Sequence, residues 1–598
     1  MEENARTSEV ADMKRVLLTN QYGPYPRSWG TNSYDITETR FHRGQGAFAL
    51  SSHIHCLALY LIAENIKAVT TVVEYPRIED FEEELRKGYD YWGIQMVSIN
   101  TNKVADMMRL ARRIAPQTKI IIGGYGVLSL DDPPPGEPTR DAQYILEQAD
   151  YICREEGIRF MRRLLGDEPV DRPITQKYPP RDGTTYPGLE QMFSDRSRNM
   201  ALVALGCPNG CEFCCTSAMF KRKKIYVATP QETFESLKHN CRRNGGRATT
   251  TALMDEDFLM NRKYVHELGK LIQEDKEFGL RKLSYFCFGD LRSMTKYSME
   301  ELLENGVDTV WIGVESSIDD VITSEHNIAK RKCDDIKSTF RGMEEYGIGI
   351  TASLVLGWDF HTRENIERDI DFFVDLKPSA HQITFLGACP GTKLYERMKK
   401  EGRINPEFAY KDIEQCNDVG SFIPKNFKRG ELKHYFDLAH TKLYEANGPG
   451  IFRMFQLNLN GYETCSTSHR PLLRKDKAPF FEERCRRGYP LIEACAKYAP
   501  NEGVRQKVDE AKGKYLRLFG EPDEEQKVYS KFFCETVGRR AERLKTEPPD
   551  ETPFDPPVRR TYYDPSRGPV PLVKKGRGPG DPVPYNAFDE PEHLSNVC

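Results

Sequence analysis

The stretch LGCPNGCEFCCTSAMF, residues 205–220, places four cysteines within nine positions of a 598-residue chain. The apolar segment directly before it has the composition of a buried strand, so the cysteines lie on the loop that follows a strand. Thiolates are soft ligands that select zinc, copper or iron–sulfur clusters. The stretch is therefore a candidate metal site, formed by Cys207, Cys211, Cys214 and Cys215.

The spacing of these cysteines helps to distinguish between the possible kinds of site. A structural zinc site usually has two C-x2–4-C pairs, and no second pair follows at that spacing. A dithiol redox motif would use Cys211 and Cys214 and leave Cys207 without a role. The C-x3-C-x2-C spacing of these three cysteines also fits a [4Fe–4S] cluster whose fourth iron stays open for a substrate.

Six strand-like segments, the first of which leads into the cysteines, alternate with helix-like segments. This alternation predicts parallel strands in a partial or full (β/α) barrel. The functional residues of such a barrel gather at the carboxyl ends of its strands, where we expect the cysteine stretch to lie. The six segments are residues 199–207, 250–258, 282–290, 309–316, 349–358 and 380–388.

A second alternating region precedes the barrel, over residues 14–166. It predicts a doubly wound, flavodoxin-like α/β domain, whose ligand would bind beyond the carboxyl ends of the strands. The expected strands are residues 15–20, 69–75, 91–99, 119–124 and 149–157, with helices at 51–65, 80–88 and 103–116. The loops at the strand ends are residues 22–30, 98–102, 123–126 and 155–157.

The other segments differ from these two regions in composition. Residues 404–545 are charged and helix-rich, without a strand pattern. Twelve of the 37 prolines lie between Pro548 and Pro591, a composition typical of an extended or disordered tail. The expected division is an N-terminal extension (1–13), the doubly wound domain (14–166), a linker (167–198), the barrel (199–403), the helix-rich region (404–545) and the Pro-rich tail (546–598).

Charge and hydropathy exclude two classes of partner. The 86 basic and 90 acidic residues give a net charge of −4, without the basic surplus of a nucleic-acid-binding protein. No apolar run approaches the ~20 residues of a membrane span. The first residues, MEENARTSEVADMKR, lack the basic and then apolar order of a signal peptide. We therefore expect a cytoplasmic protein whose sixteen cysteines stay reduced.

The cysteine stretch resembles the hallmark of the radical S-adenosylmethionine (SAM) superfamily, C-x3-C-x-Φ-C, where Φ is aromatic. Phe213 takes the aromatic position, and Cys215 has no role in the motif and is expected to pack. The resemblance implies a [4Fe–4S] cluster held by Cys207, Cys211 and Cys214, with SAM bound at the open iron.

Four later strand ends resemble other parts of the superfamily pattern, which then spans about residues 199–403. They are LMDEDF (253–258), WIGVES (311–316), SLVLGW (353–358) and GACPGTKLYERM (387–398). The resemblance implies SAM contacts from Phe213, Asp255, Glu256, Glu315, Ser316 and Leu356.

Residues 14–166 resemble the cobalamin-binding domain that a subset of this superfamily carries. The similar features are the turn SINT (98–101), the segment IIIGG (120–124) and REEG (154–157), although a Gly-Gly pair after a strand is also an ordinary tight turn. The resemblance implies cobalamin contacts from Ser98, Asn100, Thr101, Gly123, Gly124 and Glu155. The D-x-H-x-x-G motif, which supplies an axial His in other cobalamin enzymes, does not occur in residues 1–170.

The resemblance implies a cobalamin-dependent enzyme that generates a 5′-deoxyadenosyl radical and methylates an unactivated carbon of a small-molecule or lipid-like substrate. An electron donor such as flavodoxin or ferredoxin would be its partner, and residues 404–545 would close the barrel mouth. Two alternatives stay open: radical cyclisation, ring rearrangement or carbon–carbon coupling without methyl transfer, and a non-catalytic metal-binding scaffold. An auxiliary cluster would have to use widely spaced cysteines from the set Cys389, Cys416, Cys465, Cys485 and Cys495.

Overall fold

The structure of the chain is a computed structural model. It describes residues 13–22, 44–49, 51–53, 55–168, 174–177, 183–185, 199–318, 335–413, 420–546, 559–567, 572–575 and 585–586. Residues 1–12 of the expected extension 1–13, most of the loop 22–30, much of the linker and Cys416 lie outside these residues.

Five parallel strands form the centre of the N-terminal domain, in the order β3-β1-β4-β5-β6. With β2 set apart in another sheet, this is the flavodoxin-like order, whose direction of winding reverses between β1 and β4. The strands are β1 (Arg15–Thr19), β3 (Val69–Glu74), β4 (Tyr91–Gln95), β5 (Lys119–Gly123) and β6 (Tyr151–Ile152). The predicted doubly wound domain is therefore present.

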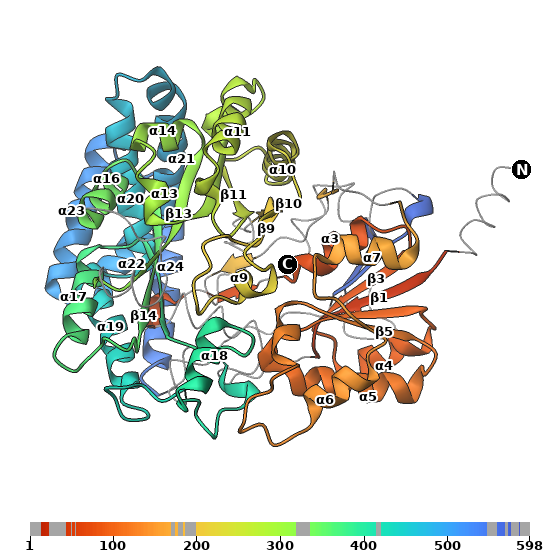
Figure 1. Cartoon of the computed structure of the whole chain (residues 1–598). Coiled ribbons are helices and arrows are strands. Elements are labelled where there is room, and N and C mark those ends of the chain that lie inside the picture. Colours follow the sequence, from red (N-terminus) through yellow and green to blue (C-terminus); the bar gives the residue numbers. More distant parts are fainter. Residues whose placement is uncertain are drawn as a thin grey trace, which may run out of the picture.

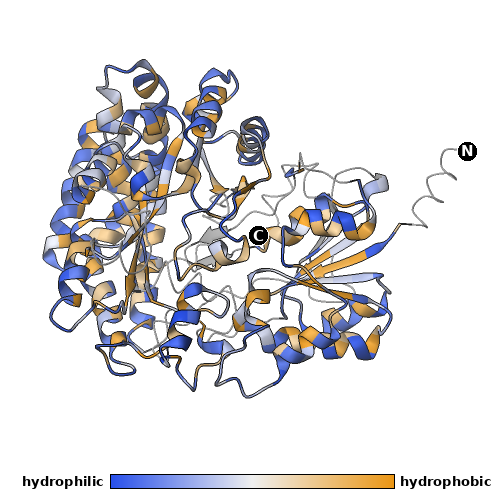
Figure 2. Cartoon of the chain, in the orientation of Figure 1, coloured by the Kyte–Doolittle hydropathy of each residue, from blue (hydrophilic) through white to orange (hydrophobic). Residues whose placement is uncertain are grey.

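Helices cover both faces of this sheet because successive strand residues point to opposite sides. Val16 and Leu18 pack toward α3 and α7, whereas Leu17 packs toward α4 and α5. Figure 1 shows the two helix layers on either side of the strands, and Figure 2 shows the apolar strand residues between them. The helices are α3 (Leu57–Glu64), α4 (Ile78–Arg86), α5 (Thr101–Ile114), α6 (Asp141–Gln148) and α7 (Gly157–Leu165).

The helix predicted over residues 51–65 is shorter than expected. Its first residues form the strand β2 (Ser51–His53), which pairs antiparallel with β7 (Gly183–Thr185). The helix α3 begins only after Cys56, because the buried Glu74 carboxylate accepts the Cys56 N–H and bonds the His55 ring, each at 2.5 Å. Burial raises the pKa of Glu74, but the contacts with His55, Tyr60 and the Cys56 N–H outweigh it and hold that pKa at about 2.

Part of the Pro-rich tail is built into the N-terminal sheet. The strand β16 (Arg559–Tyr563) pairs antiparallel with β3, and β17 (Leu572–Lys575) and β18 (Tyr585–Asn586) extend the sheet beyond it. Arg560 is 5% exposed and forms ion pairs with Asp80 at 2.6 Å and Glu84 at 2.9 Å. The sequence predicted an extended or disordered tail. Its composition did not indicate that part of the tail forms a sheet strand with a buried cation.

Six parallel strands form the second sheet, with β8 at one edge and β15 at the other. It is the partial barrel predicted from the alternation, and each of the six predicted strands is found. They are β8 (Asn199–Leu202), β11 (Thr249–Met254), β12 (Leu283–Gly289), β13 (Val307–Glu315), β14 (Gly349–Leu356) and β15 (Ala380–Phe385). The helices between them are α10 (Pro230–Arg243), α11 (Arg262–Glu274), α12 (Gly279–Lys282), α13 (Leu291–Met294), α14 (Met299–Glu304), α16 (Ile336–Glu345) and α17 (Ile366–Asp375), and α18 (Lys393–Lys400) follows β15.

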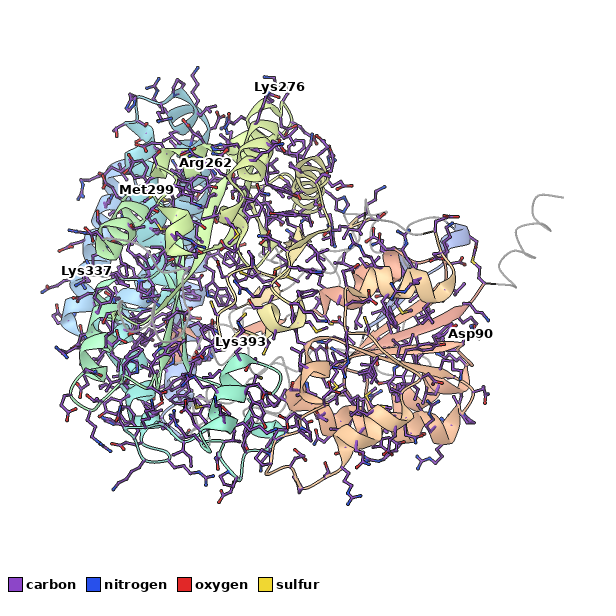
Figure 3. The ribbon with its side chains drawn as sticks, viewed as in Figure 1. Asp90, Arg262, Lys276, Met299, Lys337 and Lys393 are labelled. Carbon is purple, nitrogen blue, oxygen red and sulfur yellow. The ribbon has the colours of Figure 1, made fainter. Side chains whose placement is uncertain are left out.

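The helix-rich region packs on the outside of the barrel. Contacts of α19 with α17 and of α20 with α16 fix its position, and its own core forms around Phe452, Phe455 and Tyr515. Its helices are α19 (Leu432–Asn447), α20 (Gly450–Ser466), α21 (Ala478–Gly488), α22 (Ile492–Lys497), α23 (Glu502–Phe519) and α24 (Glu524–Arg543). In the described residues no helix has both the length and the apolar character needed to cross a bilayer. Figure 3 shows charged residues such as Asp90, Lys276 and Lys337 at the periphery.

Candidate functional site

A cavity of about 230 Å³ opens at the carboxyl ends of the barrel strands. Every strand of the barrel sheet, or the loop directly after it, contributes to its wall, as expected for a (β/α) barrel. The main lining residues are Cys207, Asn209, Cys211, Phe213, Cys214, Glu256, Asp257, Phe288, Asp290, Trp311, Glu315, Ser353, Val355, Gln382 and Thr384.

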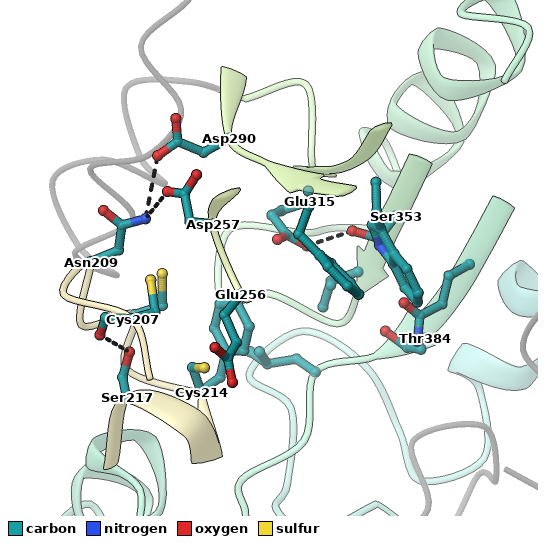
Figure 4. Close-up of a pocket in the computed structure, with 18 of the residues that line it drawn as sticks. Cys207, Asn209, Cys214, Ser217, Glu256, Asp257, Asp290, Glu315, Ser353 and Thr384 are labelled. Atoms are coloured by element: carbon teal, nitrogen blue, oxygen red, sulfur yellow. Dashed lines mark hydrogen bonds between the residues drawn. The ribbon is translucent and has the colours of Figure 1, made fainter. Parts of the chain in front are cut away.

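The three predicted cluster ligands, Cys207, Cys211 and Cys214, all line this cavity, and Figure 4 shows Cys207 and Cys214 beside it. Their loop is tight, because a Cβ on Gly206 would lie 2.1 Å from the Lys223 carbonyl oxygen, and Gly206 has φ +83°. Cys215 is the first residue of α9 (Cys215–Met219) and does not belong to the lining.

The thiols of these cysteines lie near one another at a largely buried site. Burial raises the pKa of Cys207 to about 12, and the nearby Asp257, Cys214 and Cys211 add to the rise. Three thiolates therefore require cationic partners here, which the irons of a cluster supply. No three His, Cys, Asp or Glu side chains of the described residues converge on one ion-sized point. A four-iron cluster needs no such convergence, because each cysteine binds a different iron.

Two of the three acids after β11 face the cavity. Asp255 does not line it and forms a buried ion pair with the Lys224 ammonium, at 2.6 Å. Glu256 lines the cavity, and its Oε2 is buried without a hydrogen-bond partner. Asp257, which the sequence analysis did not select, also lines the cavity, and its Oδ1 is likewise buried without a partner.

Asp257 belongs to a polar cluster built from three strand ends. The Asn209 amide donates to Asp257 at 3.1 Å and to Asp290 at 3.3 Å, and Arg292 donates to both Asn209 and Asp290. Burial, and then the charge of Asp290, raises the pKa of Asp257 to about 7. The cavity therefore carries carboxyl groups that a cationic ligand would stabilise in the charged form.

Glu315 ends β13 in a strained conformation, with φ +66°. The register with β14 shifts between Gly313 and Glu315, and this bulge directs the carboxylate into the cavity. The carboxylate accepts a hydrogen bond of 3.4 Å from the Ser353 hydroxyl (Figure 4). Glu315 is only 4% exposed, so a charged ligand group in the cavity would meet it in a desolvated setting.

Like Asp255, two more of the residues predicted to contact SAM, Ser316 and Leu356, do not line the cavity. The Ser316 hydroxyl accepts the Ile318 N–H at 3.2 Å, and Leu356 packs in the outer core of the barrel. Because side chains alternate along β14, Ser353 and Val355 face the cavity instead.

Aromatic rings form a second wall. Phe213 lines the cavity and meets Trp358 edge to face, with ring centroids 5.8 Å apart. Phe288 stacks on Trp311 at 5.1 Å, and both line the cavity. Aromatic rings and carboxylates in the same cavity suit a ligand that combines an aromatic base with a cationic end.

The predicted cobalamin contacts after β4 lie at the switch point of the N-terminal sheet. Asn100 is fully buried, and both polar atoms of its amide lack a hydrogen-bond partner. Gln21, just after β1, is also fully buried with both amide atoms unpartnered. Ser98 and Thr101 are held locally, since the Ser98 hydroxyl accepts from Ser129 at 2.9 Å and the Thr101 hydroxyl donates to the Ser98 carbonyl. Unsatisfied buried amides at a switch point fit a polar ligand there.

The remaining predicted cobalamin contacts have structural explanations. Gly124 has φ +99°, and a Cβ on it would lie 2.5 Å from the Met96 carbonyl oxygen, so its packing against β4 alone requires glycine. Gly123 is less restricted, because its nearest neighbour would be the Cys153 Cβ at 3.5 Å. Glu155 is exposed and forms an ion pair with Arg163.

The carboxyl edge of the N-terminal sheet faces the cysteine side of the barrel. Tyr125, in the turn after β5, donates to the Glu256 carboxylate at 3.3 Å and meets Phe220 edge to face. Tyr410 of the helix-rich region donates to the Ser129 carbonyl at 2.9 Å. Figure 1 shows α9 between the two domains. The predicted cobalamin edge and the predicted cluster loop are therefore neighbours.

The expected closure of the barrel mouth by residues 404–545 is not seen in the described residues. None of these residues lines the cavity. The segment around Phe408 and Ser421 lies next to it, where a small adjoining cavity shares Phe385, Leu386 and Gly387 with this one.

Comparisons with known proteins identify the barrel region. Residues 202–373 match the family described as the Radical SAM superfamily. The chain is 26% identical over 203 residues to a hopanoid C-2 methylase of Rhodopseudomonas palustris, covering 33% of this chain and 37% of that protein. It is 24% identical over 256 residues to a bacteriochlorophyllide d C-12(1)-methyltransferase of Chlorobaculum tepidum, covering 43% and 53%. The chain thus spans between about a third and about half of the length of these relatives.

Among solved structures, the chain is similar to the radical S-adenosylmethionine methyltransferase TsrM from Kitasatospora setae with cobalamin and a [4Fe–4S] cluster bound. The sequence identity is 13% and the TM-score 0.47, with 79% of this chain and 99% of that chain covered.

Proposed function

We propose, from the premise that residues 202–373 form a radical SAM domain, that the chain is a cobalamin-dependent radical SAM enzyme that methylates an unactivated carbon. The observation that carries the proposal is the cavity itself, where three cysteines, two acids after β11 and Glu315 meet at the carboxyl ends of the strands. Methyl transfer is supported by the relatives, which are named as a methylase and a methyltransferase.

The chain's residues fit the three cofactors. Cys207, Cys211 and Cys214 would hold the cluster, and its irons would offset the negative charge of the three thiolates at this largely buried loop. The unpartnered oxygens of Glu256 and Asp257 fit the cationic end of SAM. The unpartnered amide of Asn100 fits a polar group of cobalamin. When bound, the cluster with SAM supplies a radical that removes hydrogen from carbon, and cobalamin supplies the methyl group.

The residues of the chain orient the ligands and exclude water from the site. Buried carboxylates at the cavity wall hold a cationic ligand in one position, because a charge of opposite sign offsets the cost of their desolvation. The wall of Phe213, Phe288 and Trp311 keeps water from the reacting carbon. The two relatives act on a hopanoid and a bacteriochlorophyllide, and we propose an apolar small molecule or lipid as the substrate class. We further propose that the enzyme works in the reducing cytoplasm and receives electrons from a flavodoxin or ferredoxin.

Cofactor content and products test this function. Anaerobically purified protein should contain iron, sulfide and corrin by absorption spectroscopy and elemental analysis. With an apolar candidate substrate it should convert SAM into both S-adenosylhomocysteine and 5′-deoxyadenosine. Iron and sulfide without corrin, or 5′-deoxyadenosine alone, would remove methyl transfer and leave the barrel assignment standing. Protein that can be loaded with neither iron nor sulfide would overturn the radical mechanism.

Glu315→Gln should weaken SAM binding by about ten-fold or more, because a buried hydrogen bond to a charged group is worth about 1.5–3 kcal/mol. The measurement is equilibrium binding of SAM to the cluster-loaded protein. Glu267→Gln is the matched control, since Glu267 is half exposed and, within the described residues, its only ion pair is a 3.7 Å contact with Lys263. An unchanged SAM affinity in Glu315→Gln would remove Glu315 from the SAM site.

A further inference from the structure

A second cavity of about 200 Å³ lies at the opposite end of the barrel from the cysteines. Ile350, near the start of β14, and Ser379, just before β15, form its floor, whereas the first cavity uses the far ends of the same strands. Helices α20 and α23 of the helix-rich region close its sides. The lining residues are Glu344, Ile348, Ile350, Lys377, Ser379, Asn447, Arg453, Gln456, Leu457, Lys507 and Glu510.

A buried guanidinium without an anion dominates the inner end of this cavity. Arg453 is 6% exposed; it donates to the Pro378 carbonyl at 2.9 Å and lies 3.5 Å from a ring nitrogen of His381. Its Nε has no hydrogen-bond partner, and no carboxylate of the described residues forms an ion pair with it. Burial lowers the pKa of Arg453 to about 10, which still leaves it charged at neutral pH.

An uncompensated charge of this kind is costly to keep in a folded protein. Burying an ion without a partner of opposite charge costs several kcal/mol, and natural proteins normally place a carboxylate beside a buried arginine. The guanidinium fork binds planar oxyanions through two parallel hydrogen bonds. The cavity beside Arg453 has room for such a group.

The remaining charges are arranged around the mouth of the cavity. Lys377 and Lys507 are exposed lining residues, and the Lys507 ammonium donates to the Ala446 carbonyl at 2.7 Å. Glu344 is partly exposed and Glu510 exposed, so the acids also lie toward the mouth. The inner end is thus cationic, and the mouth carries charges of both signs.

We propose that this cavity binds a small anionic metabolite whose carboxylate or phosphate group pairs with the Arg453 guanidinium. The mixed charges at the mouth would contact the rest of the molecule. The site is separate from the cysteine cavity and does not depend on radical chemistry. The competing explanation is that Arg453 only ties α20 to the Pro378 carbonyl, in which case the cavity has no anion preference.

The test is calorimetric titration of the full chain with inorganic phosphate and, separately, with malonate, in chloride buffer of matched ionic strength. At least one of the two should bind saturably at one site per chain, and the pair of titrations shows whether phosphate or carboxylate is preferred. Arg453→Gln should weaken that binding at least ten-fold. Arg505→Gln on α23 is the matched control, because Arg505 is exposed and its ion pair, with Glu502, also lies on the exposed face of that helix.

Two further variants keep the test decisive if Arg453→Gln does not fold. Arg453→Lys keeps the charge but loses the planar fork, and Lys507→Gln removes an exposed charge at the mouth; each should weaken binding about three-fold or more. Absence of saturable binding of both anions to the unmodified chain overturns the proposal. So does unchanged affinity in Arg453→Gln, or in both substitute variants.

Discussion

Cys211→Ala is expected to abolish reductive cleavage of SAM. Cys211 is buried at the cavity wall between two other cysteines, and its loss would leave one iron of the proposed cluster without a protein ligand. The loss should be complete rather than partial, because cleavage depends on an intact cluster. The measurement is 5′-deoxyadenosine formed by the anaerobically reconstituted protein with dithionite as reductant, together with its iron and sulfide content.

Cys215→Ala provides the matched control on the same loop. Cys215 is the next residue but one after Phe213, yet it begins α9 and does not line the cavity. Its variant should keep the cluster and the cleavage activity. Cleavage that persists in Cys211→Ala, or that is lost equally in Cys215→Ala, would show that the ligand set is wrong.

Arg560→Ala is expected to loosen the edge of the N-terminal sheet by about 3 kcal/mol, since it leaves buried carboxylates without their shared cation. Asp80 is 2% exposed and Glu84 fully buried. The effect lies at the lower end of the usual range, because Asp80 keeps Arg77 and Glu84 keeps Lys87. Hydrogen exchange of the β3 amides, followed by mass spectrometry, should accelerate about 100-fold.

The control for this prediction removes a different partner of the same carboxylate. Arg77 pairs with Asp80 at 2.8 Å but is 39% exposed, so Arg77→Ala should cost under about 1 kcal/mol. Unchanged exchange of the β3 amides in Arg560→Ala would mean that the tail strand contributes nothing to the sheet. Equal acceleration in both variants would mean that burial of Arg560 is not the cause.

The two sheets could be predicted from the sequence because each strand has a local signal. β1 and β5 are short apolar runs between polar segments, and most helices between the six barrel strands begin at a capping Thr, Asn, Asp or Ser. The cysteine spacing likewise lies within eight residues, so no tertiary information is needed to propose a cluster. Such local patterns can be recognised from the periodicity of apolar residues in the sequence.

The polar wall of the cavity could not be predicted in the same way. Asp257, Asn209 and Asp290 come from three separate strand ends, and only the closure of the barrel brings their side chains within hydrogen-bond distance. Two of the acids in MDED were selected from a resemblance, but which of them face the cavity depends on the turn after β11. The position of Glu315 rests on a bulge that the sequence does not mark.

The tail strand was hidden for a different reason. The tail around this strand is rich in proline. The strand itself, RRTYY, has β-branched and aromatic residues but is too short to be recognised in that surrounding sequence. Its partner strand and its buried carboxylates lie far away in the sequence. The charge of Arg560 argued for exposure, whereas its two partners on α4 make burial favourable.

The strand β16 also affects the order in which the domains complete their folding during synthesis on the ribosome. Arg560 and Glu84 are 476 residues apart, so the outer edge of β3 stays open while the barrel and the helical region are being synthesised. During that time the nascent N-terminal domain exposes an unpaired strand edge and two carboxylates without their cation, which is the kind of surface that chaperones protect. The doubly wound domain is therefore completed only after the barrel and the helix-rich region, which follow it in the sequence, have been synthesised.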